Sequence, residues 1–334
     1  MIAMSALQRE LRGIVRLGLK METVTGLLIR MPVHAQVYRI GGADLYPIVT
    51  KRKYSLGGAE VEVEVPLVPG SSLKGRMRGL LELSLGKRLY TSDERIWLHA
   101  RILWGTRAHP MSTDELIRDI SGRCEVDEVF GSPAVGFDQL VEMLARDLAS
   151  KQGKEEPDDA DYEEAGKVAR SLALNLALTR LLVDDMTPDK DYVGVLSENG
   201  RRILAISDFL EEKGENRIDR ITSAADPRQV ARVKPGVVFQ GALRLLVFDI
   251  DKGYVKRNLE LVAKGLRLVE ETYLGASGSR GYGRVKFKDI SVEVMKTFGA
   301  EKPEYRKLAD LASVEALLGK VDEIAGEVEK TLFG

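Results

Sequence analysis

The chain has 334 residues, 44% of them hydrophobic, so it can bury a sizeable core in one large domain or in a few smaller ones. Its 50 lysines and arginines nearly balance its 51 aspartates and glutamates, and this net charge of −1 does not by itself indicate a nucleic-acid ligand. The single cysteine, Cys124, excludes an internal disulfide framework. Neither a leader-like segment nor a run of about 18 apolar residues is found, so we expect a cytoplasmic protein outside the membrane.

Strand patterns occur near the start of the chain. Residues 15–21 alternate apolar and polar side chains, and residues 60–65 (EVEVEV) alternate strictly, so both segments predict half-buried strands. The next stretch, LVPGSSLKGRMRGLLE (67–82), breaks at a Pro-Gly pair and then places apolar residues at helical spacing. We predict a helix there, with Ser71 or Ser72 at its N-cap.

Residues 96–187 differ from the rest in composition, and we predict that they form an inserted, mainly helical domain. Seven acidic residues lie between Glu155 and Glu164, which is typical of a solvated loop, and a helical pattern follows over residues 164–183. Without that loop the chain is mildly basic. A polyanion responds to local charge within a Debye length of about 8 Å more than to the net charge.

The second half of the chain returns to strand patterns. Alternation predicts strands at residues 201–207 and 237–248, and a third at 283–294. Between the last two, an amphipathic helix is built on Leu259, Val262, Leu266 and Val269.

The order strand, helix, strands, helix, strand predicts the α+β class. We expect a ferredoxin-like (RRM-like) antiparallel sheet with both helices on one face. This core is discontinuous, comprising residues 1–95 and 188–300, and a C-terminal helical tail occupies residues 301–334.

The predicted helix at the Pro-Gly break has the features of an anion-binding surface. Lys74 and Arg78 lie on one flank of its apolar stripe, Arg76 lies on the other, and Gly75 and Gly79 fall opposite the core. Each glycine costs a helix roughly 0.5 to 1 kcal/mol relative to alanine, so two of them indicate a ligand close to the backbone. A helix N-terminus also suits phosphate. The alternative is a capped surface helix with solvated cations.

A glycine-rich stretch, LGASGSRGYGRVKF (274–287), runs from helix to loop to strand, the reverse of dinucleotide and P-loop motifs. A phosphate here would be held by cationic side chains and loop N–H groups, and Tyr282 could stack on a base. The alternative is a glycine C-cap that leads into a strand. The candidate residues are Arg280, Arg284 and Lys286, with the glycines Gly275, Gly278, Gly281 and Gly283.

Three ordered motifs, PLVPGSSLKGRMRGLLE, NRIDRITSAADPRQVARVKPGVVF (216–239) and LGASGSRGYGRVKF, together resemble the RAMP superfamily of CRISPR-associated proteins. The likeness spans about residues 10–295 and is greatest to the Cas7-like backbone subunit of the type III-A (Csm) effector complex. It implies an RRM-like core whose copies polymerise along CRISPR RNA (crRNA) beside other Csm subunits, with binding that is largely independent of RNA sequence.

The resemblance also assigns residues to RNA. The glycine-rich loop and the helix residues Ser71, Ser72, Lys74, Arg76 and Arg78 would lie near the RNA backbone. The 216–239 stretch, with Arg220 and Arg228, resembles a thumb hairpin that inserts between guide and target RNA.

Cleavage of complementary target RNA is a further implication of the resemblance. The segment RIGGADLYPIVTKR (39–52) resembles the Ile-Gly-Gly-x-Asp loop of the family and nominates Asp44 as the catalytic residue of a metal-dependent endoribonuclease. A carboxylate with a pKa of about 3.9 is a weak base, so it would hold Mg²⁺ or position the ribose 2′-hydroxyl. The preceding RMPVHAQVY (30–38) replaces a shorter, glycine-richer loop.

Two alternatives to target cleavage stay open. The first is a non-catalytic, structural crRNA-binding protein of the same complex, in which Asp44 is an ordinary turn residue. The second is a metal-independent processing endoribonuclease, for which His34 is the only histidine outside the predicted insertion.

A structural zinc site is the last implication of the resemblance. Many relatives carry Cys-x-x-Cys before a Phe-Gly pair, and here CEVDEVFG (124–131) places Cys124 first and Asp127 second. With the upstream His99 and His109, these groups are chemically adequate ligands for tetrahedral Zn²⁺. Unrelated histidines and a small buried cysteine are the alternative.

Overall fold

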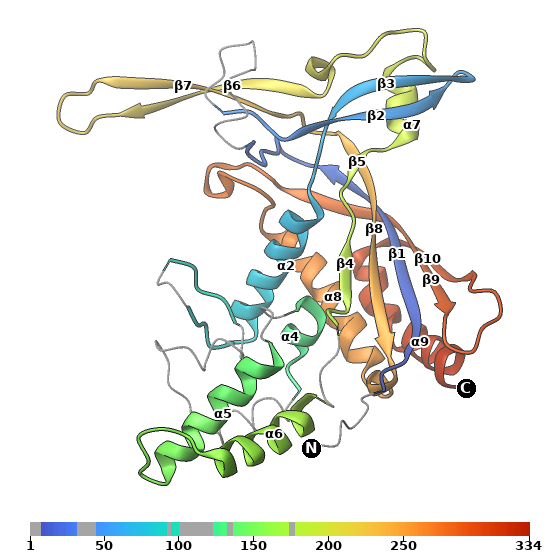
Figure 1. The fold of residues 1–334 in the computed structure, drawn as a ribbon. Coiled ribbons are helices and arrows are strands. Elements are labelled where there is room, and N and C mark those ends of the chain that lie inside the picture. Colours follow the sequence, from blue (N-terminus) through green and yellow to red (C-terminus); the bar gives the residue numbers. More distant parts are fainter. Residues whose placement is uncertain (1–7, 32–44, 92–94, 100–122, 132–135, 174–177) are drawn as a thin grey trace.

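The computed structural model describes residues 8–31, 45–91, 95–99, 123–131, 136–173 and 178–334. None of the helices in these ranges is both long enough and apolar enough to cross a bilayer. The central feature is an antiparallel sheet with the strand order β10-β9-β1-β8-β4, in which β5 also pairs with β8 (Figure 1). Its strands are β1 (Leu11–Thr23), β4 (Leu181–Val183), β5 (Thr187–Pro188), β8 (Val238–Phe248), β9 (Val285–Lys296) and β10 (Tyr305–Ser313).

The order β9-β1-β8-β4 is that of a ferredoxin-like sheet, as the sequence predicts. Helices α2 (Gly70–Ser84) and α8 (Val255–Glu271) connect its strands, and their apolar residues share one core with the inward side chains of β1 and β8. The two helices approach closely because Gly265 lacks a side chain, and a Cβ there would lie 3.0 Å from Met77 Cε. Each large apolar side chain buried in this layer stabilises the fold by about 1.5 to 3 kcal/mol.

The sequence predicted a helical tail, but the tail also contains a strand. Residues 301–334 contain the strand β10, which extends the sheet beyond β9, followed by helix α9 (Val314–Phe333). Ser313 caps this helix, because its hydroxyl accepts the N–H of Ala316 at 3.2 Å. The apolar stripe of α9 is buried against the main core, so the tail is an integral part of the domain.

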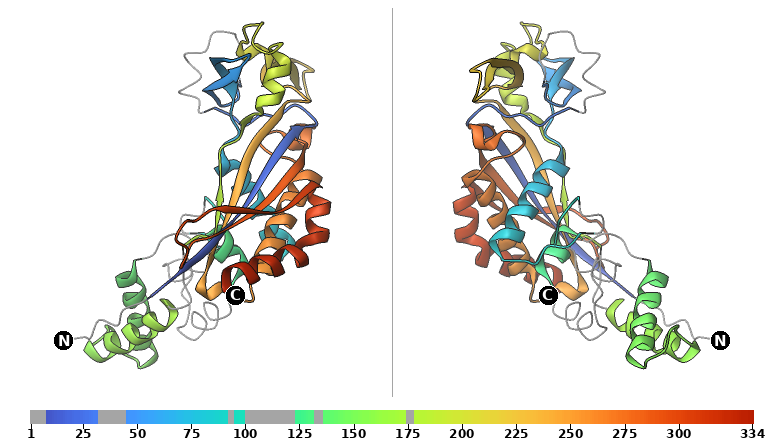
Figure 2. Two further views of the ribbon diagram at one scale, coloured as in Figure 1. Left: turned by 90° about the vertical axis from the view of Figure 1, so that its right-hand side faces the viewer. Right: turned by 90° about the vertical axis from the view of Figure 1, so that its left-hand side faces the viewer.

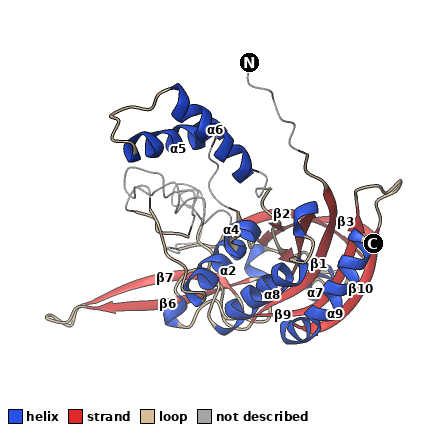
Figure 3. Cartoon of the chain, turned by 90° about the horizontal axis from the view of Figure 1, so that it is seen from below, coloured by secondary structure: helices blue, strands red, loops and turns tan. Residues whose placement is uncertain are grey.

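Two hairpins lie outside the central sheet. Strands β2 (Val49–Leu56) and β3 (Ala59–Pro66) are joined by Gly57 and Gly58, whose positive φ angles suit a tight two-residue turn. Helix α7 (Lys190–Leu196) lies beside this hairpin. Strands β6 (Leu210–Ile218) and β7 (Ala225–Val233) form a second hairpin, here called the arm, which extends well beyond the rest of the molecule (Figures 1 and 3).

The predicted insertion contains three helices in its described part, α4 (Glu125–Phe130), α5 (Phe137–Lys151) and α6 (Asp159–Ala173). Helices α5 and α6 bury a small apolar cluster of their own and lie at the opposite end of the molecule from β2 and β3 (Figure 2). Helix α4 packs instead on the main core through Val126, Val129 and Phe130. The acidic run is not simply a solvated loop, since α6 begins within it and Asp161 is buried beside Lys154.

Two further secondary-structure predictions are wrong. The helix expected over residues 164–183 is described as far as Ala173, but residues 181–183 form β4 at the edge of the core sheet, although they fall within the predicted insertion. An apolar run of this length does not distinguish a helix from a strand. Residues 201–207 form no strand, because Asp208 accepts the N–H of Ala205 and stabilises a short 3₁₀ turn (Ile206–Asp208), while Ile203 is 93% exposed.

Candidate nucleic-acid interface

The N-terminus of α2 is capped by the protein itself. The helix begins at Gly70 with Pro69 at the N-cap, so the predicted capping role of Ser71 or Ser72 is wrong; both serines lie in the first turn. The N–H of Gly70 donates to Asp185 Oδ1 at 2.8 Å, which places a carboxylate where a phosphate was expected. A Cβ at Gly70 would lie 2.1 Å from the Val183 carbonyl oxygen, so this close approach requires glycine.

The cations of α2 make internal contacts rather than projecting freely. Lys74 Nζ donates to the Leu181 carbonyl at 2.8 Å, and burial, followed by the charge of Arg78, lowers the pKa of Lys74. Arg78 pairs with Glu82 and donates to the carbonyl oxygens of Gly131 and His99. These two residues therefore attach the helix to β4 and to the segment around α4.

Arg76 joins α2 to the glycine-rich loop. Its Nε donates to the Tyr273 carbonyl at 2.9 Å, and its guanidinium lies 4.0 Å above the Tyr273 ring. The helix and the loop are thus neighbours on the same side of the molecule, as the resemblance required. On the outer face of α2, a methyl group added at Gly75 or Gly79 would meet nothing within 4 Å among the described residues.

The four glycines of the loop have structural explanations. Gly275, Gly281 and Gly283 have positive φ angles, a region that other residues rarely adopt. A Cβ at Gly283 would lie 2.0 Å from the Leu274 carbonyl oxygen, and one at Gly278 would meet the Tyr273 ring at 2.1 Å. The N–H groups of residues 280–284 bond within the protein, so phosphate binding by this part of the loop would depend on its side chains.

Tyr282 is buried, so its ring is not available to stack on a base as the sequence predicted. Its side chain is 1% exposed and packs with Leu28 and Val230. The ring lies between Lys213 Nζ (4.5 Å) and the Arg232 guanidinium (4.4 Å), and its hydroxyl donates to Glu215 Oε1 at 2.6 Å. Burial and this hydrogen bond raise the pKa of Tyr282 to about 12. Tyr282 therefore fixes the base of the arm to the glycine-rich loop.

Arginines from three separate segments converge where the arm meets this loop. One hollow, of about 450 Å³, is lined by Glu215, Asn216, Arg217, Ile218, Arg220, Arg228 and Arg280. A second, of about 500 Å³, is lined by Arg30, Leu45, Asp226, Pro227, Arg228 and Arg280. Arg228 and Arg280 border both hollows. Here the two hollows are together called the arginine surface.

The arginine surface is positive but contains two carboxylates. Five arginines against Glu215 and Asp226 leave a formal charge of +3. Asp226 Oδ2 lies 2.9 Å from Arg217 and 3.6 Å from Arg228, and Glu215 Oε2 lies 3.3 Å from Arg280. Arg30 and Arg220 make no ion pair with the described residues. This composition can bind an extended anion with several phosphates.

The structure brings together some predicted residues and not others. Arg220, Arg228 and Arg280 lie on the arginine surface, whereas Arg284 is exposed but lines neither hollow. Asp44 and His34 lie outside the described residues. Leu45, the next residue after Asp44, lines the second hollow, and its carbonyl accepts the N–H of Ala231 on β7 at 3.0 Å.

Sequence reasoning missed Arg30, Arg217 and Glu215. A hairpin register could have found the last two, because Glu215 stands opposite Arg228 across the arm and Arg217 lies two residues further on the same face. Arg30 has no such local signal. It reaches this surface through the bridge between Arg30 and Pro47.

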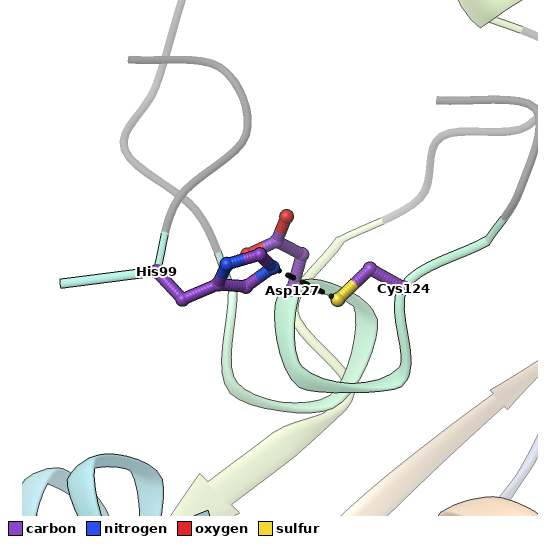
Figure 4. Close-up of side chains that lie close together, drawn as sticks. All are labelled: His99, Cys124 and Asp127. Carbon is purple, nitrogen blue, oxygen red and sulfur yellow. Dashed lines mark hydrogen bonds between the residues drawn. The ribbon is translucent and has the colours of Figure 1, made fainter. Parts of the chain in front are cut away.

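His99, Cys124 and Asp127 form a compact cluster, and their ligand atoms all lie within 4.8 Å of one another (Figure 4). His99 Nδ1 donates to the Arg88 carbonyl at 2.7 Å, which leaves Nε2 facing Cys124 Sγ at 3.2 Å. This is the orientation of a metal-binding histidine held by a backbone carbonyl. Burial alone would lower the pKa of His99, but its bonds to Cys124 and to the carbonyl outweigh burial and raise it.

These three residues fit a structural Zn²⁺ in ligand type and spacing. The predicted fourth ligand, His109, lies outside the described residues. Arg78 NH2 lies 3.6 Å from Asp127 Oδ1, so a cation already stands next to the cluster. A metal ion there would have to compete with Arg78 for the carboxylate.

Comparison with known proteins supports the resemblance to the RAMP superfamily. A family model of the RAMP superfamily matches residues 44–286. The chain is 30% identical over 250 residues to "CRISPR system Cms endoribonuclease Csm3" of Methanothermobacter thermautotrophicus, covering 73% of this chain and 78% of the relative. It is 27% identical over 292 residues to the protein of the same name from Methanocaldococcus jannaschii, covering 84% and 88%.

A solved structure supports the fold. The Methanopyrus kandleri Csm3 crystal structure aligns with a TM-score of 0.53 and 22% identity, covering 95% of this chain and 98% of that one. The range matched by the family model, residues 44–286, includes Leu45 beside the second hollow, the whole arm and the glycine-rich loop as far as Lys286. The chain therefore belongs to the RAMP superfamily and, within it, to the Csm3 family.

Proposed function

We propose that this protein is the crRNA-binding backbone subunit of a type III-A effector complex and that the arginine surface grips the RNA backbone. The convergence of Arg30, Arg217, Arg220, Arg228 and Arg280 at one place supports this proposal. Phosphates on a single strand match a row of guanidinium groups, which bind them through paired hydrogen bonds. No aromatic ring takes part among the residues that line the two hollows, so the grip is electrostatic and independent of base sequence.

Salt titration of RNA binding tests the arginine surface. Single-stranded RNA of mixed sequence is titrated against the wild type, Arg228→Ala and Arg280→Ala at several salt concentrations. Each variant weakens binding and reduces the salt slope by about 0.7, the value for one lost phosphate contact on a single strand. Arg146→Ala is the matched control, because Arg146 is exposed on the distant helix α5. Equal losses in all three variants would show that only the overall charge matters.

Assembly is part of the same proposal. Copies of the chain associate side by side along crRNA, bind other Csm subunits, and act in the cytoplasm. The arm supports this view, because residues 216–229 at its end are exposed and the hairpin extends well beyond the rest of the molecule (Figures 1 and 3). Analytical ultracentrifugation with RNA of increasing length tests it. The number of chains per RNA rises in steps with length, and a constant one-to-one ratio contradicts polymerisation.

Target cleavage is carried by Asp44 in this proposal, together with Mg²⁺. The carboxylate would hold the metal ion or position the ribose 2′-hydroxyl. That hydroxyl loses its proton and attacks the adjacent phosphorus, the bond from phosphorus to the 5′-oxygen of the next nucleotide breaks, and the products are a 2′,3′-cyclic phosphate and a protonated 5′-hydroxyl. Support comes from the names of the relatives, and from Leu45, which lines a hollow bordered by three arginines.

The cleavage test compares reconstituted complexes that contain wild type or Asp44→Ala with Mg²⁺ present. Loss of cutting with retained RNA binding supports catalysis by Asp44. Unchanged cutting removes Asp44 from the active site and leaves the structural, non-catalytic role.

A structural Zn²⁺ held by His99, Cys124 and Asp127, with His109 as the fourth ligand, is the last part of the proposal. Elemental analysis of the purified protein gives about one zinc per chain, and Cys124→Ser reduces it. Metal at trace levels in the wild type would leave the cluster as a hydrogen-bonded group without metal.

A further inference from the structure

A carboxylate stands in the middle of the surface proposed to bind a polyanion. Glu215 Oε2 lies 3.3 Å from Arg280 NH1, and Lys213 Nζ lies 3.9 Å from Oε1. The Glu215 side chain is 18% exposed, so part of it faces the hollow that it helps to line. A phosphate that approaches Arg280 therefore meets a negative charge that is already paired with that arginine.

Glu215 is held by the buried Tyr282, whereas Arg280 is largely exposed. The hydroxyl of Tyr282 donates to Oε1 at 2.6 Å, and Tyr282 is itself fixed between Lys213 and Arg232. Arg280 is 59% exposed, and its NH2 donates to Ser277 Oγ at 3.0 Å. When an anion binds, the arginine can turn toward it, but the carboxylate cannot follow.

We infer that Glu215 acts through Arg280 as an internal counter-ion that RNA must displace, and that it thereby sets the affinity and salt dependence of this surface. The inference rests on the proposed function. Carboxylate and phosphate groups both bind a guanidinium group through charge-assisted hydrogen bonds, so the carboxylate takes the place of a phosphate while RNA is absent. Its remaining negative charge then opposes the bound strand, so each contact through Arg280 is weaker than an isolated arginine would give.

The decisive variant is Glu215→Gln. Glutamine keeps the shape of the side chain, and its one carbonyl oxygen can still accept the hydrogen bond of Tyr282, so the arm stays attached to the loop. It removes the charge and places an amide NH2, which cannot accept a hydrogen bond, toward Arg280. A melting curve by circular dichroism that matches the wild type verifies that the fold is unchanged.

Glu212→Gln is the matched control, because Glu212 lies three residues away on the same strand and is exposed. It changes the net charge by the same amount without touching Arg280. Single-stranded RNA binding to the full chain is measured for wild type, both glutamine variants, Arg280→Ala and the double variant Glu215→Gln/Arg280→Ala.

Glu215→Gln is expected to tighten binding by about 2- to 5-fold, the range for one partly exposed ion pair, and to steepen the salt slope by up to about 0.7. Glu212→Gln has a smaller effect, and the gain disappears in the Arg280→Ala background. Equal gains from both glutamine variants, no gain from Glu215→Gln, or a gain that persists without Arg280 would each overturn the inference. If Arg280→Ala alone leaves binding unchanged, the proposed RNA surface itself is wrong.

Discussion

Removal of one buried charge should destabilise the fold strongly. Asp251 is 1% exposed and accepts hydrogen bonds from Arg180 NH2 (3.0 Å), from Arg123 NH2 (3.0 Å) and from the N–H of Phe248 (2.9 Å). Arg180 is the largest fully buried side chain of the described residues. Asp251→Asn keeps the volume but leaves this guanidinium without its counter-ion. Loss of one partner of a buried pair costs about 3 to 5 kcal/mol.

Thermal unfolding measures this cost. At about 1.4 °C per kcal/mol for a chain of this size, the Tm of Asp251→Asn should fall by about 4 to 7 °C. The control is Asp322→Asn, which makes the same substitution in an exposed pair with Lys256. Exposed pairs contribute about 0 to 1 kcal/mol, so its Tm should change by no more than about 1.4 °C. Equal shifts in the two variants would refute the assignment of stability to the buried network.

Three further predictions concern stability. Burial alone would raise the pKa values of Glu125 and Glu128, but Lys87 lowers the pKa of Glu125 and Arg123 lowers that of Glu128 by more than burial raises them. The stability that the two carboxylates contribute is therefore complete above the unfolded pKa of about 4.3 and is lost as the pH falls through their folded pKa values. Thermal melting between pH 3 and 7 should show this loss, and the fall in Tm toward acid pH should be smaller in Glu128→Gln. Gly283→Ala should lower the free energy of unfolding by more than about 1 kcal/mol, because φ is +75° and the new Cβ would meet the Leu274 carbonyl oxygen. Gly281→Ala has a similarly strained φ but no atom in the way, so urea titrations should show a smaller loss of stability for it. Gly319→Ala should stabilise by about 0.4 to 1 kcal/mol, since Gly319 is exposed inside α9 with open space around it; a lower urea midpoint would contradict this reasoning.

The location of the arginine surface was only partly predictable. Arg220, Arg228 and Arg280 were nominated by motif, and all three line it. The predicted roles of Arg78 and Tyr282 did not account for their internal partners, which lie far away in sequence. Arg78 contacts the segment around α4, and Tyr282 contacts the arm. A sequence pattern indicates that a side chain is charged or aromatic, but it does not tell which backbone or carboxylate will reach it.

The sequence by itself determined the α+β core. In β1 and β8 the alternation of apolar side chains fixes which face is buried, and in α8 the stripe of Leu259, Val262, Leu266 and Val269 fixes the side that packs on the sheet. Only the tertiary structure decided that residues 181–183 become a strand, that Asp185 caps α2, and that Glu215 pairs with Arg280. Periodicity is a local property that selects a buried face. Edge pairing, caps and ion pairs depend on which distant segment folds against the strand edge, the helix end or the charged side chain.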